Sequence, residues 1–177
     1  AGLATRPAVF VCPQNGSTLP TYDTGTQATG SYAVCAGSFG PTYGISDQVK
    51  ITNNGMFLYK TVMKVAQCTD GLSNTFMVGE VIEGHKPASD NRWTLAGRHA
   101  ASLRTTDNPL NTPVTKGVVQ GSGTTAQNGA FASDHPGGGQ FVLGDGRVTF
   151  ISEDIDLRIY RALGTRAGNE AETGKTD

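Results

Sequence analysis

The segment 133–152, SDHPGGGQFVLGDGRVTFIS, carries the clearest structural signal in the chain. Asp145 and Gly146 are typical of the two central positions of a type I′ turn, both of which need a positive φ angle. In the resulting hairpin two apolar pairs would face each other across the strands, namely Leu143 with Val148 and Phe141 with Phe150. A shift of one residue would scatter these side chains over both faces, so the pattern predicts this register. Asp145 and Gly146 are thus expected to have structural roles.

The same segment contains a histidine, His135, ahead of the first strand of the hairpin. Ten residues of extended chain span about 30 Å, so His135 and Asp145 cannot meet unless residues 136–139 turn the chain back. We therefore expect no shared catalytic or metal site for His135 and Asp145. His135 is expected to have a structural role, in which it ends a loop and hydrogen-bonds locally.

The composition predicts one domain rich in strands and loops. Its 177 residues suffice for a single domain, expected over residues 1–170 and followed by a polar tail, 171–177. Lys and Arg number 14 against 15 Asp and Glu, which disfavours binding to nucleic acid or to an anionic membrane surface. The 24 glycines and 8 prolines indicate many turns. No apolar stretch is long enough to cross a membrane.

Four segments are expected to form strands because they are rich in β-branched or aromatic residues. They span residues 8–12, 31–37, 55–66, which has room for two strands, and 75–82. In the last segment apolar residues lie on both faces, with Phe76 and Val78 on the same one, so we expect a strand covered on both sides. The turn before it contains Asp70, which is expected to cap that turn.

A helix is predicted after the hairpin, within residues 152–164. Apolar side chains recur there at helical spacing, Ser152 or Asp154 is a candidate N-terminal cap, and Gly164 is a typical C-terminal stop. Together these elements predict an α+β fold, rich in strands, with an antiparallel sheet, long loops and a C-terminal helix.

Three cysteines are present, and their spacing fits no zinc motif. For a secreted protein the simplest arrangement is one disulfide and one free thiol. Cys12 and Cys35 are the expected pair, because both lie in Gly-, Thr- and Pro-rich sequence that buries little apolar area. Three buried free thiols are the alternative.

No residue pattern of a common catalytic site is present, and no catalytic residue is assigned. The G-x-S-x-G motif of hydrolases is absent, and His85, His99 and His135 show no metal-binding spacing. Asp70 and Glu80 could act as the acid and base of a glycosidase. Turn capping by Asp70 and a surface ion pair of Glu80 explain both carboxylates more simply.

Aromatic residues in loops offer a candidate ligand site. The candidate ligand-binding residues are Trp93 and His99, in the loop-rich segment 84–133, and Tyr43, in an earlier loop. Exposed flat rings suit the faces of sugars, so a carbohydrate or another small solute is the ligand that such a site would bind. The favoured interpretation is that Trp93 instead anchors a long loop on the core.

Four motifs together resemble a known family. They are FVCP at 10–13, CTDGLSNTFMVGE at 68–80, DHPGGGQFVLGDGRVTFIS at 134–152 and LGTRAGNE at 163–170. In this order they resemble the planctomycete-type domain of unknown function 1559, also labelled a family-10 bacterial solute-binding domain. It is grouped with pilin-like and pseudopilin-like proteins that carry a C-terminal signature of His, nine residues and Asp-Gly.

The resemblance implies a pilin-like head domain, exported to the cell surface, the extracellular space or the periplasm. It implies association with itself or with other pilin-like subunits, and membrane contact only through an N-terminal helix that this sequence lacks. Some pseudopilin heads bind calcium in loops near their C-terminal strands. Asp134 and Asp145 are the candidate ligands here, and Asp154 offers a further oxygen nearby in sequence. Calcium is thus the one cofactor considered, and the family offers no catalytic residues to carry over.

The sequence favours a noncatalytic exported subunit, with a structural or surface-interaction role in a filament. The first alternative is an extracellular module that binds carbohydrate, such as a surface polysaccharide, or a small solute. The second is a carboxylate-dependent hydrolase.

Overall fold

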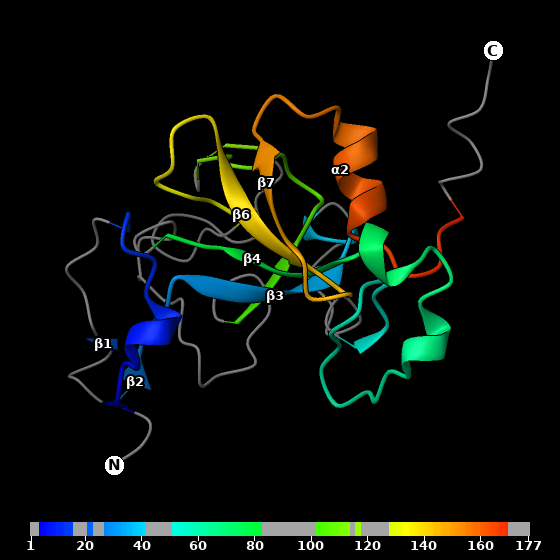
Figure 1. Ribbon diagram of the computed structural model, residues 1–177, viewed down its shortest axis with the longest axis horizontal. Coiled ribbons are helices and arrows are strands. Elements are labelled where there is room, and N and C mark those ends of the chain that lie inside the picture. The colour runs from blue at the N-terminus through cyan, green and yellow to red at the C-terminus, as the bar shows by residue number, and fades with distance from the viewer. Residues whose placement is uncertain are drawn as a thin grey trace.

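A five-stranded mixed sheet forms the centre of the computed structural model, which describes residues 4–15, 21–22, 27–41, 51–82, 102–113, 116–117 and 128–169 (Figure 1). The order of its strands is β5-β3-β4-β6-β7. They are β3 (Tyr32–Gly37), β4 (Phe76–Glu80), β5 (Leu103–Thr105), β6 (Gly138–Leu143) and β7 (Val148–Ser152). All neighbours are antiparallel except β3 and β5, which run parallel. A separate pair joins β1 (Thr21–Tyr22) to β2 (Gln27–Ala28).

The short helix α2 (Leu157–Leu163) covers one face of the sheet and completes the core (Figure 1). Its buried Tyr160 lies with its ring centroid 5.9 Å from that of Phe76 and 6.2 Å from that of Phe141. Phe76 and Phe141 stack at 4.3 Å, and Phe131 meets Phe141 edge-on at 5.1 Å. Offset and edge-on contacts of this kind add to the stabilisation from buried area. The expected α+β fold, rich in strands and with a C-terminal helix, is therefore confirmed, although β5 makes the sheet mixed.

The other face of the sheet is less covered. Val78, Val142 and Val148 lie side by side across β4, β6 and β7 in the observed pairing. The exposed fraction rises outward from the partly buried Val78 and Val142 to 62% for Val148, and Phe150 on the same strand is 46% exposed. An apolar face is thus partly open to solvent.

The predicted turn of the β6–β7 hairpin is wrong by one residue. The amide of Gly146 donates to the carbonyl of Leu143 at 2.9 Å. The amide of Leu143 donates to the carbonyl of Arg147, also at 2.9 Å. Gly144 and Asp145 are therefore the central residues, and only Gly146 has a positive φ, of 86°. This is a type I turn closed by a left-handed glycine, which spares Asp145 the strained conformation of a type I′ turn. Asp145 accepts a hydrogen bond from the amide of Arg147 at 2.9 Å.

The observed register separates the apolar pairs that the sequence predicted. Val142 now faces Val148, and Gln140 faces Phe150. Phe141 and Leu143 stay in the core, whereas Val148 and Phe150 move to the partly open face. A shift of one residue has this effect because successive side chains of a strand point to opposite faces.

Two other strand predictions are confirmed and two are wrong. Segments 31–37 and 75–82 contain β3 and β4, but a bulge between Phe76 and Val78 puts Phe76 on the face opposite Val78. Segment 8–12 contains a 3-10 turn, Ala8–Phe10. Segment 55–66 forms a single bridge between Leu58 and Thr61, and its valines are exposed rather than buried. These valines have a high β-propensity, but among the described residues no strand pairs with this segment.

The predicted C-terminal helix is present but begins later than expected. Asp156 is its cap, and the side chain accepts hydrogen bonds from the amides of Arg158 and Ile159 at 2.8 and 3.3 Å. Ser152 accepts from the amide of Asp154 and so belongs to the preceding turn. Gly164 ends the helix as predicted. Within the described residues, no helix has the length and apolar character required to cross a membrane.

The hairpin register predicts unequal roles for two apolar residues. Leu143→Ala should lower the free energy of unfolding by about 2–5 kcal/mol, because it empties part of the core. Val148→Ala should change that free energy by less than about 0.5 kcal/mol, because Val148 is mostly exposed. Urea denaturation of both variants measures the difference. Equal losses would indicate that the two side chains share one buried face.

Candidate functional site

Glu80, the last residue of β4, is a buried carboxylate with an exposed fraction of 3%. Its Oε2 accepts hydrogen bonds from the Ser133 hydroxyl at 2.8 Å and from the backbone amide of Gln140 at 2.7 Å. A buried charge is strongly destabilising unless such partners are present. The surface ion pair expected for Glu80 is therefore wrong, because pairing of β4 with β6 closes over this residue.

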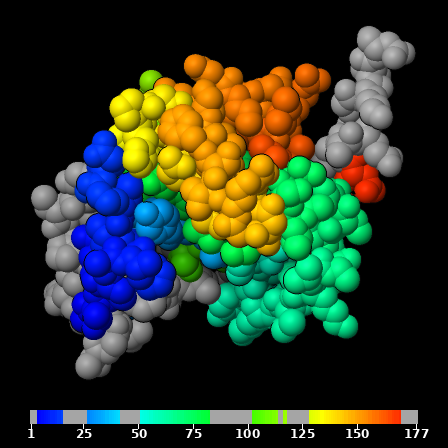
Figure 2. Space-filling view, in the orientation of Figure 1, coloured from blue at the N-terminus to red at the C-terminus, as the bar shows by residue number. Residues whose placement is uncertain are grey.

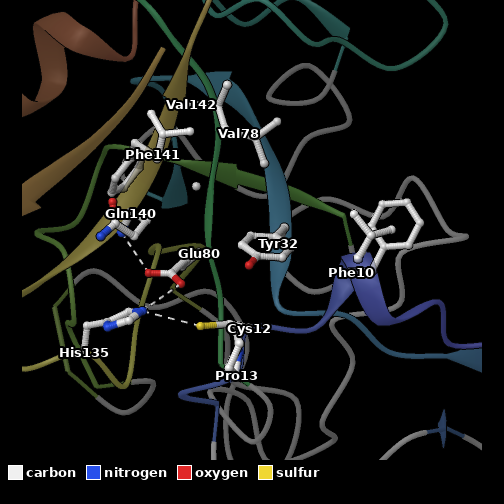
Figure 3. A pocket seen from close by; sticks show the side chains of 13 residues that line it. Phe10, Cys12, Pro13, Tyr32, Val78, Glu80, His135, Gln140, Phe141 and Val142 are labelled. Carbon is white, nitrogen blue, oxygen red and sulfur yellow. Dashed lines mark hydrogen bonds and ion pairs between the residues drawn. The ribbon is translucent and has the colours of Figure 1, made fainter. Parts of the chain in front are cut away.

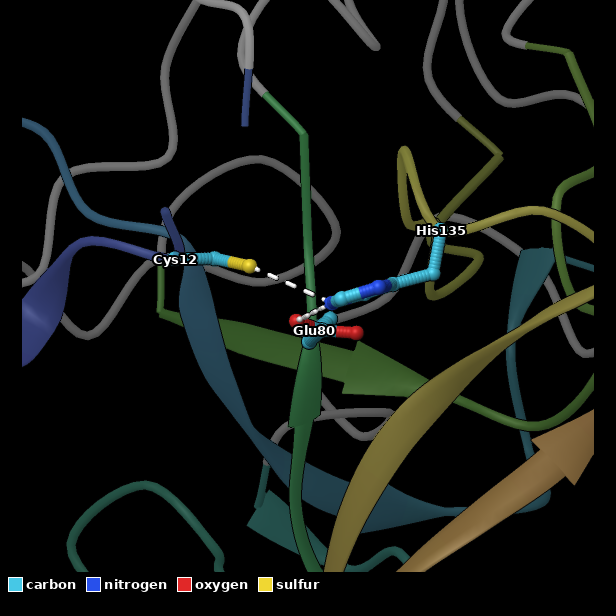
Figure 4. A group of neighbouring side chains, drawn as sticks. All are labelled: Cys12, Glu80 and His135. Atoms are coloured by element: carbon cyan, nitrogen blue, oxygen red, sulfur yellow. Dashed lines mark hydrogen bonds and ion pairs between the residues drawn. The ribbon is translucent and has the colours of Figure 1, made fainter. Parts of the chain in front are cut away.

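His135 lies against the second oxygen of this carboxylate. Its Nε2 is 3.4 Å from Oε1 of Glu80 and 3.5 Å from Sγ of Cys12. The backbone amide of His135 donates to the Ser133 hydroxyl at 3.1 Å, which ties the histidine to the residue that holds Glu80. The local hydrogen bond of His135 is made by its backbone, whereas its ring joins residues from two distant parts of the chain. Figure 4 shows the three side chains pointing toward one another.

Cys12 reaches the cluster from a turn near the N-terminus. The amide of Asn15 donates to the carbonyl of Cys12 at 3.0 Å, and the backbone at Gln14 and Asn15 also hydrogen-bonds to the thiol. The amide of Ser31 donates to the carbonyl of Phe10 at 2.8 Å and fixes this segment beside the start of β3. Burial, followed by the hydrogen bond to Glu80, raises the pKa of the Cys12 thiol, and the backbone hydrogen bonds oppose this rise.

The expected disulfide between Cys12 and Cys35 is absent, because the two thiols lie on opposite faces of the sheet. Cys12 neighbours Tyr32 on the partly open face, whereas Cys35 belongs to the core and contacts the carbonyl of Gly164 at 3.8 Å. Complete burial raises the pKa of Cys35 to about 12. Cys68 donates to the hydroxyl of Thr75 at 3.3 Å. All three cysteines are free thiols.

A pocket of about 440 Å³ opens beside the cluster on the partly open face of the sheet. Its apolar walls come from the N-terminal segment and from β4, β6 and β7, while Cys12, Glu80 and His135 lie at one end (Figure 3). Figure 2 shows this side of the molecule, with the N-terminal segment in blue and the hairpin in yellow and orange. The lining side chains are Val9, Phe10, Cys12, Pro13, Tyr32, Val78, Glu80, His135, Gln140, Phe141, Val142 and Val148.

The cluster does not have the arrangement of a nucleophilic triad. In such a triad the nucleophile and the carboxylate contact different nitrogens of the histidine ring. Here Cys12 and Glu80 both approach Nε2 of His135. The geometry instead brings a sulfur, a nitrogen and an oxygen together around one point.

The three residues of the cluster each lie in a different one of the four segments that carry the family resemblance. A family model described as protein of unknown function (DUF1559) matches residues 3–158. The chain belongs to the DUF1559 family. No curated protein and no solved structure matches the chain.

The DUF1559 motifs contained a signal that sequence reasoning missed. FVCP contains Cys12, the motif at 68–80 ends in Glu80, and DHPGGG contains His135. The linear sequence predicts a disulfide for Cys12 and a surface position for Glu80, because nothing in the spacing shows that the three segments meet. The available signal was that Cys12, Glu80 and His135 are all residue types that bind metal ions, and that each lies in a different motif.

The other predicted site residues of this DUF1559 chain do not join the cluster. Asp134 and Asp145, the candidate calcium ligands, are exposed at opposite ends of β6, and neither belongs to a group of three candidate ligands among the described residues. Asp70 accepts hydrogen bonds from the amides of Gly168 and Asn169 at 2.7 and 2.9 Å, at the opposite end of β4 from Glu80. Trp93, His99 and Tyr43 lie outside the described residues.

The positions of the thiols predict how the protein reacts with iodoacetamide. In urea without reductant, all three cysteines should be alkylated, because no disulfide protects them. In the native protein at pH 8, Cys35 should stay unmodified, because it is buried and its pKa is about 12. Intact-mass spectrometry counts the adducts. A single adduct per chain in urea would indicate a disulfide after all.

Proposed function

We propose that this DUF1559 domain is a noncatalytic module that binds a small solute in the pocket on the partly open sheet face. The observation that carries the proposal is the pocket itself, which combines a volume of about 440 Å³ with apolar walls and a polar end. Pockets that hold small molecules have volumes of roughly 300–1,000 Å³, apolar linings and a few convergent polar groups. The solute-binding label of the family agrees with this function.

The lining indicates the chemistry of the solute. Val78, Val142 and Val148 offer an apolar wall with no hydrogen-bonding group, which suits an aliphatic or aromatic body. At the other end, Glu80 and His135 offer hydrogen-bonding groups that would orient a polar head. We therefore propose an amphipathic small molecule, rather than a sugar stacked on Trp93, as the solute.

A pilin-like subunit is the second candidate function. Beyond the pocket the exposed side chain of Phe150 continues the apolar surface of Val148, as a surface for another protein or a second copy would. Self-association, contact with other pilin-like subunits or a surface polysaccharide, and an exported location stay predictions from the family resemblance. A carboxylate-dependent hydrolase has less support, because Asp70 and Glu80 lie at opposite ends of β4.

Solute binding predicts that filling the pocket abolishes the uptake of an apolar probe. Anilinonaphthalene sulfonate should fluoresce with the wild-type protein, and Val142→Trp should weaken its binding at least about tenfold, because the indole occupies the pocket. Ile159→Trp is the matched control, since Ile159 is exposed on α2 and does not line the pocket. Fluorescence titration gives the dissociation constants, and circular dichroism verifies the fold. Unchanged probe binding by Val142→Trp would contradict the proposal.

The subunit function predicts self-association through the same face. Sedimentation velocity should then show oligomers of the wild-type protein that Phe150→Asp disperses, because a buried charge opposes the apolar contact. Monomers at every concentration would remove the support for self-association through this face and leave the solute as its proposed partner.

A further inference from the structure

We propose that Cys12, Glu80 and His135 bind a thiophilic divalent cation of the Zn²⁺ class. The proposal concerns the polar end of the pocket and holds whether or not the apolar walls accept a solute. The ligand atoms, Sγ, Nε2 and a carboxylate oxygen, all lie within 4.8 Å of one another. Thiolate, imidazole and carboxylate are the three side-chain ligands of zinc in proteins.

Two of the three distances within the cluster match those around a tetrahedral ion. Bonds of about 2.3 Å to sulfur and about 2.0 Å to nitrogen or oxygen place neighbouring ligand atoms roughly 3.3–3.6 Å apart. Sγ of Cys12 is 3.5 Å from Nε2 of His135, and that nitrogen is 3.4 Å from Oε1 of Glu80. The third distance, between Sγ of Cys12 and the carboxylate of Glu80, is within 4.8 Å, so a small movement of either side chain would complete the ligand set around such an ion.

The residues around the cluster orient the ligand atoms. The Ser133 hydroxyl and the Gln140 amide both donate to Oε2 of Glu80, which leaves Oε1 directed at His135. The amide of Asn15 donates to the carbonyl of Cys12 at 3.0 Å and so fixes the turn that carries the thiol. Outer contacts that fix ligand orientation in this way are characteristic of metal sites in proteins.

The set of ligands also determines the class of ion. A thiolate disfavours Ca²⁺ and Mg²⁺, which prefer oxygen ligands, and favours Zn²⁺ or Co²⁺. Three protein ligands leave a fourth tetrahedral position for water or for a donor atom of a bound molecule. Because all three side chains line the pocket, a bound ion would border it.

Co²⁺ is the probe that tests the site, because its spectrum reports both tetrahedral geometry and bonding to sulfur. The metal-free, reduced wild-type protein should bind one Co²⁺ per chain, with a sulfur-to-cobalt band in the near ultraviolet. Zn²⁺ should displace the cobalt and raise the Tm, because it binds the folded state. No such band with equimolar Co²⁺ in the wild-type protein would overturn the proposal, whatever the variants do.

Matched variants locate the ion. Cys12→Ser should remove the band and weaken Zn²⁺ binding at least about a hundredfold, whereas Cys68→Ser should leave both unchanged, because Cys68 contacts Thr75 outside the cluster. Ser133→Ala should weaken Zn²⁺ binding about tenfold and keep the band, because it removes only an orienting contact. Competition with a chromophoric chelator measures the affinities. A band that survives in Cys12→Ser, or disappears in Cys68→Ser, would place the ion elsewhere and overturn the proposal.

Discussion

The buried carboxylate of Glu80 joins three parts of the chain that are distant in sequence. It lies at the end of β4, accepts hydrogen bonds from Ser133 and Gln140, and contacts His135, which in turn contacts Cys12. A charge in this position is tolerated only while its partners surround it. The segment before β6 and the N-terminal turn are therefore held in place by the same group that forms the candidate site, so the site and the local fold depend on one another.

The two faces of the sheet have different roles, and small irregularities in the strands decide which residue belongs to which. The bulge in β4 brings Phe76 to the face of α2 and leaves Val78 on the other side. The turn of the hairpin keeps Phe141 inward and puts Val148 outward. The aromatic core stabilises one face, and a row of valines remains on the other. The pocket exists because the second row is only partly covered.

The pocket and the cluster together favour binding over catalysis. The two ring contacts described for His135 both involve Nε2, an arrangement that differs from that of a nucleophilic triad. An apolar cavity with one polar end is instead suited to an amphipathic molecule, which has an apolar body and a polar head. A cation held at the polar end would add a fixed charge and an open coordination position to an otherwise apolar surface, which links the two proposals without making either depend on the other.

The sequence by itself determined the local features of this protein. The strand-rich composition, the strands at 31–37 and 75–82, the Asp-Gly hairpin and the glycine stop of the last helix all follow from properties of neighbouring residues. The hairpin register was mispredicted because two turn types suit the same Gly-Asp-Gly residues. The tertiary structure has the register in which Ile151, and not Val148 or Phe150, packs against the core. The burial of Glu80 and its meeting with Cys12 and His135 were decided by the tertiary structure alone. Such contacts join residues 55 to 123 positions apart, and no periodicity along the chain encodes them.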